Sequence, residues 1–393
     1  MKAFPLTLLL CLTTVFGLES IEVQNTARDE QEEKVQLDTS RVTLQNKWLT
    51  LWICPELNGG IENVLWKERN LPLLWGGGLQ WQSYGPLFAR PIATGVLFQE
   101  KFWGQAFAGQ TPMVQQSCNA QELTLYSDTY ESLPIKLIRR ISLPSGELAI
   151  HFEVKIHGCS QQSLRNVKFL PWLNLLPSGD IDWNAVIPAL GGDVVNGLGQ
   201  KTALPATGIY RHGGSSPNAF FASARQWIAV SSPKEKLSMA LVHDYDNAGC
   251  TMYSWQGKLE GKNARTIEFI LPEFKAANGN AEFFCYRYRL LVFPGLGDLR
   301  EICDDTGIEM QRDGQTLRLK FVATKRQAAA PITLEILQDK SKPISLGTRQ
   351  LPELQPAVCQ ELFFELPADS VPTGIVGHWG TRRFELLNLV QGK

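Results

Sequence analysis

The feature that most constrains the fold is a long series of short apolar runs rich in β-branched and aromatic residues. Turn residues separate these runs from one another. Trp48–Ile53 and Ile61–Trp66 flank Asn58-Gly59-Gly60, a pattern typical of two strands joined by a turn. Leu148–Ile156 alternates apolar and polar residues with a period of two, as a half-buried strand does. No convincing amphipathic helix longer than about two turns interrupts the series. Many strands at short spacing predict an antiparallel sandwich or barrel.

The strand pattern divides into two parts. Further strands of the first part are expected at Leu123–Tyr126, Ile135–Leu143, Val167–Leu173, Trp227–Ser231, Leu237–His243, Ala264–Leu271 and Phe283–Phe293. Pro294–Asp298 closes this part, and a short helix or turn is expected over Leu299–Asp305. The β pattern then restarts with six or seven strands. The sequence therefore predicts a large β domain over 41–303 and an immunoglobulin-like β-sandwich over 304–393.

Composition limits the classes of function. Hydrophobic residues make up 44% of the 393 residues, so the chain can bury a sizeable core. The formal net charge is −1, and this lack of a basic excess argues against nucleic acid as the main partner. No G-x-S-x-G, H-E-x-x-H or dinucleotide-binding motif occurs, so a serine hydrolase, zinc protease or nucleotide-dependent enzyme is not indicated.

The N-terminus has the pattern of an export signal. Lys2 supplies a positive charge, Phe4–Phe16 is an apolar run, and Val15 and Gly17 are small enough for a cleavage site after Gly17. The run is shorter than the ~20 residues that span a bilayer. We therefore expect a signal peptide over 1–17, an acidic flexible leader over 18–40, and a secreted or periplasmic protein without stable membrane insertion.

The cysteines do not form a recognisable metal site. The chain has eight, and removal of the signal peptide with Cys11 leaves seven. No C-x-x-C occurs, and no cysteine or histidine cluster has zinc spacing. Export permits disulfides, but the sequence leaves their pairing open. No metal and no cofactor is expected.

One stretch resembles a known family. Tyr130–Leu143 reads YESLPIKLIRRISL, and Gly146–Ile181 reads GELAIHFEVKIHGCSQQSLRNVKFLPWLNLLPSGDI. These runs resemble the middle strands of galactose-mutarotase-like proteins, and the resemblance extends more loosely over about residues 41–300. It implies a large antiparallel supersandwich that handles carbohydrate. Gly59-Gly60-Ile61 and Tyr286–Arg289 resemble the family's first turn and final strand.

The chain departs from that family at a position that matters for catalysis. The epimerases' binding strand begins with a His, and the corresponding run here is Leu170-Pro171-Trp172-Leu173-Asn174-Leu175. Asn174 and Leu175 match, Trp172 replaces a Tyr, and the catalytic His position holds Leu170. Mutarotation needs a proton donor and a carboxylate base, and leucine supplies neither. The resemblance therefore implies the fold without the usual epimerase chemistry.

Three residues are candidates for an alternative acid–base pair. His212 lies in the Gly-rich segment Tyr210–Gly214, interpreted as a loop, and His243 precedes the acidic turn Asp244–Asn247. Glu268 lies within an apolar strand, where burial would raise its pKa. The alternatives are a plain polar turn for the His243 segment and a solvent-facing position for Glu268.

Aromatic and polar residues are candidates for sugar contacts. The segment Leu74–Trp103 is rich in aromatic residues and glycine, and either lines a groove or forms a packed barrel corner. The predicted substrate-binding residues are Trp75, Trp81, Arg90, Trp103, Trp172, Asn174 and Asp244.

Three hypotheses follow. The first is an exported carbohydrate-binding protein without catalytic activity. The second is a carbohydrate-active enzyme, epimerase-like or lyase-like, with His212 or His243 as acid and Glu268 as base. The third is a structural or adhesion β protein. They are distinguished by whether these side chains meet on one concave face.

Overall fold

A computed structural model describes residues 41–55, 59–74, 96–98, 114–127, 135–158, 168–196, 200–212, 218–259, 262–272, 274–275, 283–338, 342–368, 370 and 372–390. These residues are organised almost entirely as antiparallel strands, with a short 3-10 helix, η2 (Lys67–Arg69), after β3. Within these ranges, no helix has the length and apolar character needed to cross a membrane. The predicted all-β fold is confirmed.

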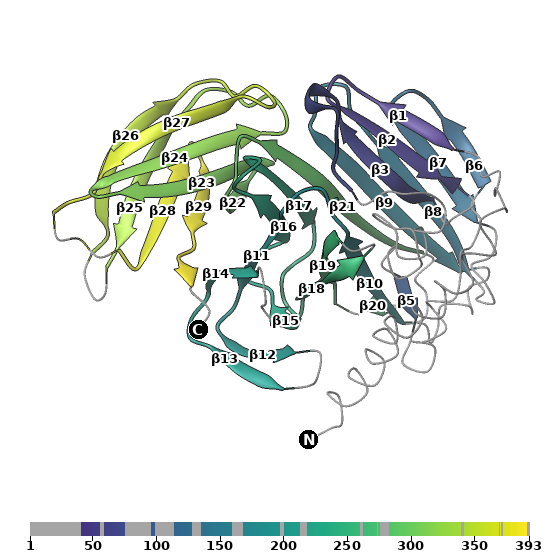
Figure 1. The fold of residues 1–393 in the computed structure, drawn as a ribbon, viewed down its shortest axis with the longest axis horizontal. Coiled ribbons are helices and arrows are strands. Elements are labelled where there is room, and N and C mark those ends of the chain that lie inside the picture. Colours follow the sequence, from purple (N-terminus) through teal and green to yellow (C-terminus); the bar gives the residue numbers. More distant parts are fainter. Residues whose placement is uncertain are drawn as a thin grey trace.

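The largest sheet has ten strands and is the central layer of the first part of the chain (Figure 1). In spatial order it comprises β30 (Leu389–Val390), β14 (Gly208–His212), β11 (Asn184–Ala189), β16 (Trp227–Ser232), β17 (Leu237–His243), β21 (Phe283–Pro294), β9 (Ala149–Gly158), β8 (Ile135–Ser142), β7 (Glu122–Ser127) and β6 (Val114–Cys118). Two smaller layers cover one face of it along its length.

One of these layers is a four-stranded sheet from the N-terminal end of the described chain. It comprises β1 (Val42–Gln45), β2 (Leu49–Cys54), β3 (Gly60–Trp66) and β4 (Leu71–Pro72). In Figure 1 this purple sheet lies across β7, β8 and β9. Leu44 and Leu51 join Leu123 and Leu125 in one buried cluster, because alternate residues of each strand point between the sheets.

The other layer is an eight-stranded sheet, which carries the candidate site. Its path runs β13 (Lys201–Leu204), β12 (Gly192–Asn196), β15 (Ala219–Ala222), β18 (Thr251–Leu259), β19 (Lys262–Ile270), β10 (Lys168–Leu175) and β20 (Phe274–Lys275), with β5 (Val96–Phe98) paired to β10. Leu173, Phe269 and Met252 project into the same core as Val230 and Leu241 of the ten-stranded sheet. The two large sheets therefore form one sandwich.

The C-terminal part is a separate small sandwich with its own core. One sheet comprises β22 (Leu299–Cys303), β23 (Thr306–Asp313), β24 (Thr316–Ala323) and β27 (Cys359–Glu365). The other comprises β26 (Ile344–Leu351), β25 (Ala330–Leu337), β28 (Gly374–Trp379) and β29 (Arg382–Leu386). This pairing is the immunoglobulin-like arrangement of two antiparallel sheets that the sequence predicts. Leu319, Phe321 and Trp379 lie in its core.

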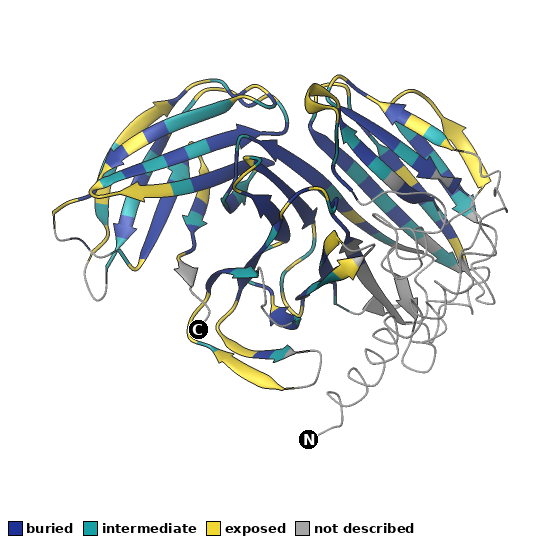
Figure 2. Cartoon of the chain, in the orientation of Figure 1, coloured by how far each residue is buried: buried dark blue, intermediate teal, exposed yellow. Residues whose placement is uncertain are grey.

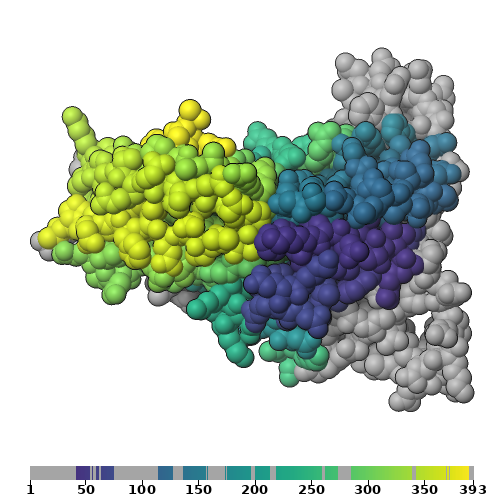
Figure 3. Space-filling model, turned by 90° about the horizontal axis from the view of Figure 1, so that it is seen from above, coloured from purple at the N-terminus to yellow at the C-terminus, as the bar shows by residue number. Residues whose placement is uncertain are grey.

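The two sandwiches pack against each other through an apolar junction. The face of the ten-stranded sheet that points away from the eight-stranded sheet buries Trp227, Val242 and Phe293 against Leu299 and Val322 of the small sandwich. Figure 2 shows buried residues continuing through β16, β17 and β21, and Figure 3 shows the two parts in close contact. After the last strand of the small sandwich, the chain returns to the ten-stranded sheet, where β30 pairs in parallel with β14.

The strand expectations differ from the structure in one place that affects the junction. Leu299–Cys303, expected as a short helix or turn, is strand β22, and the turn follows at Asp304 and Asp305, both with positive φ. Glu301 is buried because Arg225 and Trp227 donate hydrogen bonds to its carboxylate.

Candidate functional site

The β18–β19 hairpin presents two chemically different faces. Successive side chains on a strand point to opposite sides of the sheet, and antiparallel partners share a side. Met252 pairs with Phe269, and both lie in the core between the large sheets. Tyr253 pairs with Glu268, so these two residues belong to the other side. We call this side, which carries Tyr253, Trp255, Thr266 and Glu268, the Glu268 face.

The Glu268 face combines aromatic rings with a buried carboxylate. Phe220 of β15 stacks on Tyr253 with ring centroids 4.3 Å apart. Thr266 donates a hydrogen bond from Oγ1 to Glu268 Oε1 at 2.9 Å. Glu268 is only 6% exposed, and its charge together with burial raises the pKa of Tyr253. The expected alternative, in which Glu268 points to bulk solvent, is not what the structure shows.

The half-buried Trp255 lies at the margin of this face. Its indole occupies the space above Gly257, where an added Cβ would come within 2.4 Å of the ring. It also packs against Leu176 and Ala264. Glycine at position 257 therefore lets the ring lie against the strand, which leaves an aromatic surface next to Thr266.

His243 points away from the Glu268 face. It ends β17 in the ten-stranded sheet, and its ring meets Phe269 edge-on with centroids 4.5 Å apart. Because Phe269 and Glu268 are adjacent in β19, their side chains point in opposite directions. Tyr245 donates its backbone N–H to His243 Nδ1 at 3.2 Å. Burial lowers the pKa of His243 to about 4, so the ring is neutral at ordinary pH.

His212 is a strand residue rather than a loop residue. The prediction of a loop at Tyr210–His212 is wrong, since this segment is the end of β14 and His212 pairs with Ala185 of β11. Its ring meets Phe221 of β15 edge-on, which places it between the two large sheets. Burial and the nearby charge of Arg265 lower its pKa to about 4.

The structure thus does not join either histidine to Glu268. All five histidines of the chain lie in described ranges, four on the ten-stranded sheet and His378 in the small sandwich. Glu268 lies on the eight-stranded sheet and faces away from the core that receives His212 and His243. A pair across one sugar ring, as the acid–base hypothesis requires, is not formed by these residues.

The predicted sugar contacts have mixed outcomes. In the backbone register of β10 and β19, Asn174 pairs with Glu268 and Trp172 pairs with Ile270. Asp244 lies elsewhere, because it pairs with Arg289 at 3.0 Å near the junction with the small sandwich. Trp75, Trp81, Arg90 and Trp103 fall outside the described residues. The strand that contains positions 172 and 174 is therefore the neighbour of the strand that carries Glu268, whereas Asp244 is apart from both.

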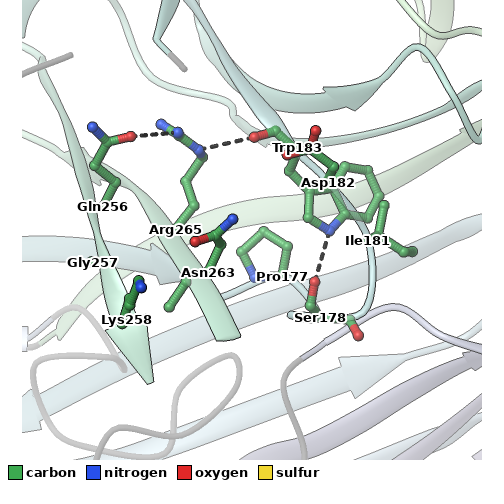
Figure 4. Close-up of a pocket in the computed structure, with 11 residues that line it drawn as sticks. Pro177, Ser178, Ile181, Asp182, Trp183, Gln256, Gly257, Lys258, Asn263 and Arg265 are labelled. Carbon is green, nitrogen blue, oxygen red and sulfur yellow. Dashed lines mark hydrogen bonds between the residues drawn. The ribbon is translucent and has the colours of Figure 1, made fainter. Parts of the chain in front are cut away.

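Sequence reasoning missed a cavity of about 430 Å³ at the end of the β18–β19 hairpin where Lys258 pairs with Asn263 (Figure 4). The segment Pro177–Trp183 forms one wall, and Gln256, Lys258, Asn263 and Arg265 line the other. Trp183 is fixed there because its indole N–H donates to Ser178 O at 3.0 Å. The alternation of polar residues at 256, 258, 263 and 265 was a signal, but the segment before Trp183 has no pattern that would place it opposite them.

Arg265 is the most constrained residue of this cavity. Its Nε donates to the carbonyl of Trp183 at 3.0 Å, and Nη2 donates to Gln256 Oε1 at 2.7 Å. Both acceptors are neutral. Burial lowers the pKa of Arg265, and the carboxylate of Asp182 acts in the opposite direction. Among the described residues, no group of three or more His, Cys, Asp or Glu forms a potential metal site.

Comparison with known proteins gives similarity at the level of solved structures. No family model matches the chain, and no curated protein matches it. A galactose mutarotase related enzyme from Lactobacillus acidophilus is 10% identical, covering 65% of this chain and 98% of its own, with a TM-score of 0.43. A galactose mutarotase-like protein from Lactobacillus casei is 12% identical, covering 64% and 100%, with a TM-score of 0.41.

A putative mutarotase from Salmonella typhimurium is 13% identical over 65% of this chain and 92% of its own, with a TM-score of 0.45. At such identities the likeness concerns the arrangement of strands and not the chemistry of the site.

Proposed function

We propose that the chain is an exported carbohydrate-binding protein that holds a sugar on the Glu268 face without catalysing a reaction on it. The observation that carries the proposal is the placement of a buried carboxylate beside aromatic rings on one side of the eight-stranded sheet. Glu268 is held by Thr266, and Trp255 presents a half-buried ring at the margin. Small-molecule sites combine apolar and aromatic surface with a few fixed polar groups in this way.

The geometry favours binding over acid–base catalysis. Hydrolysis, elimination or epimerisation of a sugar needs a proton donor and an acceptor within reach of the same ring. The two candidate histidines contact Phe221 and Phe269 on the inner side of the sheet, and position 170 is leucine. The two candidate histidines therefore lie on the opposite side of the sheet from Glu268.

A glycan array with the protein cleaved after Gly17 tests the proposal. We expect at least one class of neutral glycan to bind, and we expect Glu268→Gln to weaken that binding about tenfold, since a charged hydrogen-bond acceptor becomes an amide. Glu335→Gln, which changes a carboxylate on β25 of the small sandwich, is the matched control and leaves binding unchanged. Absence of binding to every glycan would favour a structural or adhesion role, and turnover of a bound glycan would contradict the absence of catalysis.

A further inference from the structure

The cavity beside Arg265 contains a buried guanidinium that forms no ion pair with a described carboxylate. Arg265 is 9% exposed, and its Nη1 has no hydrogen-bond partner among the described residues. Its other two contacts are to a carbonyl and an amide oxygen, and no described carboxylate forms an ion pair with it. Buried charges in proteins are normally paired or bound to a ligand, because an isolated one is costly.

A second cation lies at the same cavity. Lys258 lines it, is exposed, and forms no ion pair with any described residue. This distinguishes it from Lys262 on the same hairpin, which binds Asp180 at 2.6 Å. Asn263 adds an amide from the neighbouring strand. In Figure 4 these side chains come from β18 and β19 and lie across the cavity from Pro177 and Trp183.

We propose that this cavity binds the carboxylate of a small cyclic organic acid, with Lys258 and Asn263 as direct contacts and Arg265 as a buried source of positive charge. Lys258 and Arg265 against Asp182 leave one net positive charge, which suits a single carboxylate and disfavours a phosphate dianion. Nη1 of Arg265 is fully enclosed, so the guanidinium acts through its field rather than through a bond from that atom.

The rest of the cavity determines the body of the ligand. Pro177, Ile181 and Trp183 give it an apolar wall, and a volume of about 430 Å³ accommodates a single sugar or aromatic ring. The cavity lies toward the inner side of β18 and β19, since Arg265 and Gln256 alternate with Thr266 and Trp255 of the Glu268 face. The two sites are therefore distinct, and this inference does not rest on the proposed function.

Calorimetric titration with D-glucuronate and D-glucose tests the inference, because these probes share a ring and differ in the carboxylate. We expect glucuronate to bind the full-length mature protein and glucose to bind the cavity about tenfold more weakly or not at all. Lys258→Glu and Asn263→Asp each place a negative charge at an exposed position of the cavity, so folding is preserved and glucuronate affinity falls about tenfold or more.

Lys234→Glu, at an exposed lysine of the β16–β17 turn, is the matched charge control and leaves glucuronate affinity unchanged. Glu268→Gln also leaves it unchanged, which separates this site from the Glu268 face. Failure of glucuronate to bind, equal affinity for glucose, or equal loss in Lys234→Glu would overturn the inference.

Discussion

The core between the two large sheets and the junction with the small sandwich are both buried, but they treat polar groups in opposite ways. In the core, His243 packs on Phe269 and stays neutral because burial lowers its pKa. At the junction, Glu309 accepts hydrogen bonds from the backbone N–H groups of Gly297 and Asp298 and binds Lys320 at 2.6 Å. The core keeps the His243 ring uncharged, whereas the junction pairs its charged groups.

The difference follows from what surrounds each region. Apolar residues of several strands enclose His243, and burial lowers its pKa, so a protonated ring there would lose hydration without compensation. The junction contains the turns that link the two sandwiches, and their unpaired backbone N–H groups can be satisfied by carboxylates. Arg289 likewise binds Asp305 at 2.8 Å beside Lys325. These networks fix the relative position of the two sandwiches.

The largest expected effect comes from breaking the junction network at Glu309. Glu309→Ala leaves Lys320, the buried N–H of Gly297 and the part-buried N–H of Asp298 without their acceptor. We expect a loss of about 3–5 kcal/mol in the free energy of unfolding, measured by denaturant titration. Glu365→Ala, which changes an exposed carboxylate on β27, is the control and should alter stability by no more than about 0.5 kcal/mol. Equal losses would mean that the junction is not held by this carboxylate.

The next largest effect is a loss of stability at acidic pH, which tests whether the core keeps His243 uncharged. The folded-state pKa of His243 is about 4, below the ordinary value of 6.5, so the unfolded chain binds a proton that the folded chain does not. Stability should therefore fall as the pH drops from about 6.5 towards 4, by up to about 3 kcal/mol for this residue. Unfolding titrations between these pH values measure the slope.

His243→Asn removes the titrating ring and retains an acceptor for the Tyr245 N–H. The variant should show a shallower loss of stability with acid than the unmodified chain, whatever its stability at pH 7. His378→Asn in the small sandwich is the control. An unchanged slope in His243→Asn would show that the folded core does not keep this ring uncharged.

The smallest effect is expected at Glu301, which is buried at the junction. Burial raises its pKa against the opposing effect of Arg225, so the ionised form gains little from its surroundings. Glu301→Gln keeps an oxygen for the Trp227 indole N–H and the Ile302 N–H, which both bind Oε1. We expect a change of about 1 kcal/mol or less by denaturant titration. A loss as large as that of Glu309→Ala would show that charge, rather than hydrogen bonding, is needed here.

The strands were predictable where the alternation of apolar and polar residues and the content of β-branched and aromatic residues both indicate a strand. Leu237–His243 was predicted with the bounds that β17 has, and β21 and β9 lie within one or two residues of expectation. Strand β18, which carries part of the candidate site, was missed. Strands β11 to β15 were also missed, since Pro188, the glycines of Gly191-Gly192 and several alanines hide the pattern in sequence. Whether such segments form strands depends on their pairing with distant strands, and a single sequence does not show that pairing.

The site was only partly predictable for a related reason. Parity along a strand puts Glu268 and Phe269 on opposite sides, but the sequence does not say which side faces the second sheet. The register that sets Asn174 opposite Glu268 likewise depends on pairing between segments almost a hundred residues apart. The cavity beside Arg265 depends on a wall from Pro177–Trp183, whose position no local pattern encodes.

A crystal structure of the chain without residues 1–17, bound to a glycan selected on the array, tests the proposed sugar site most directly. We expect the sugar ring against Trp255 with a hydroxyl bound at Thr266 or Glu268, and no histidine within hydrogen-bond distance of it. A sugar bound elsewhere, or one contacted by both Glu268 and a histidine, would contradict the proposed site.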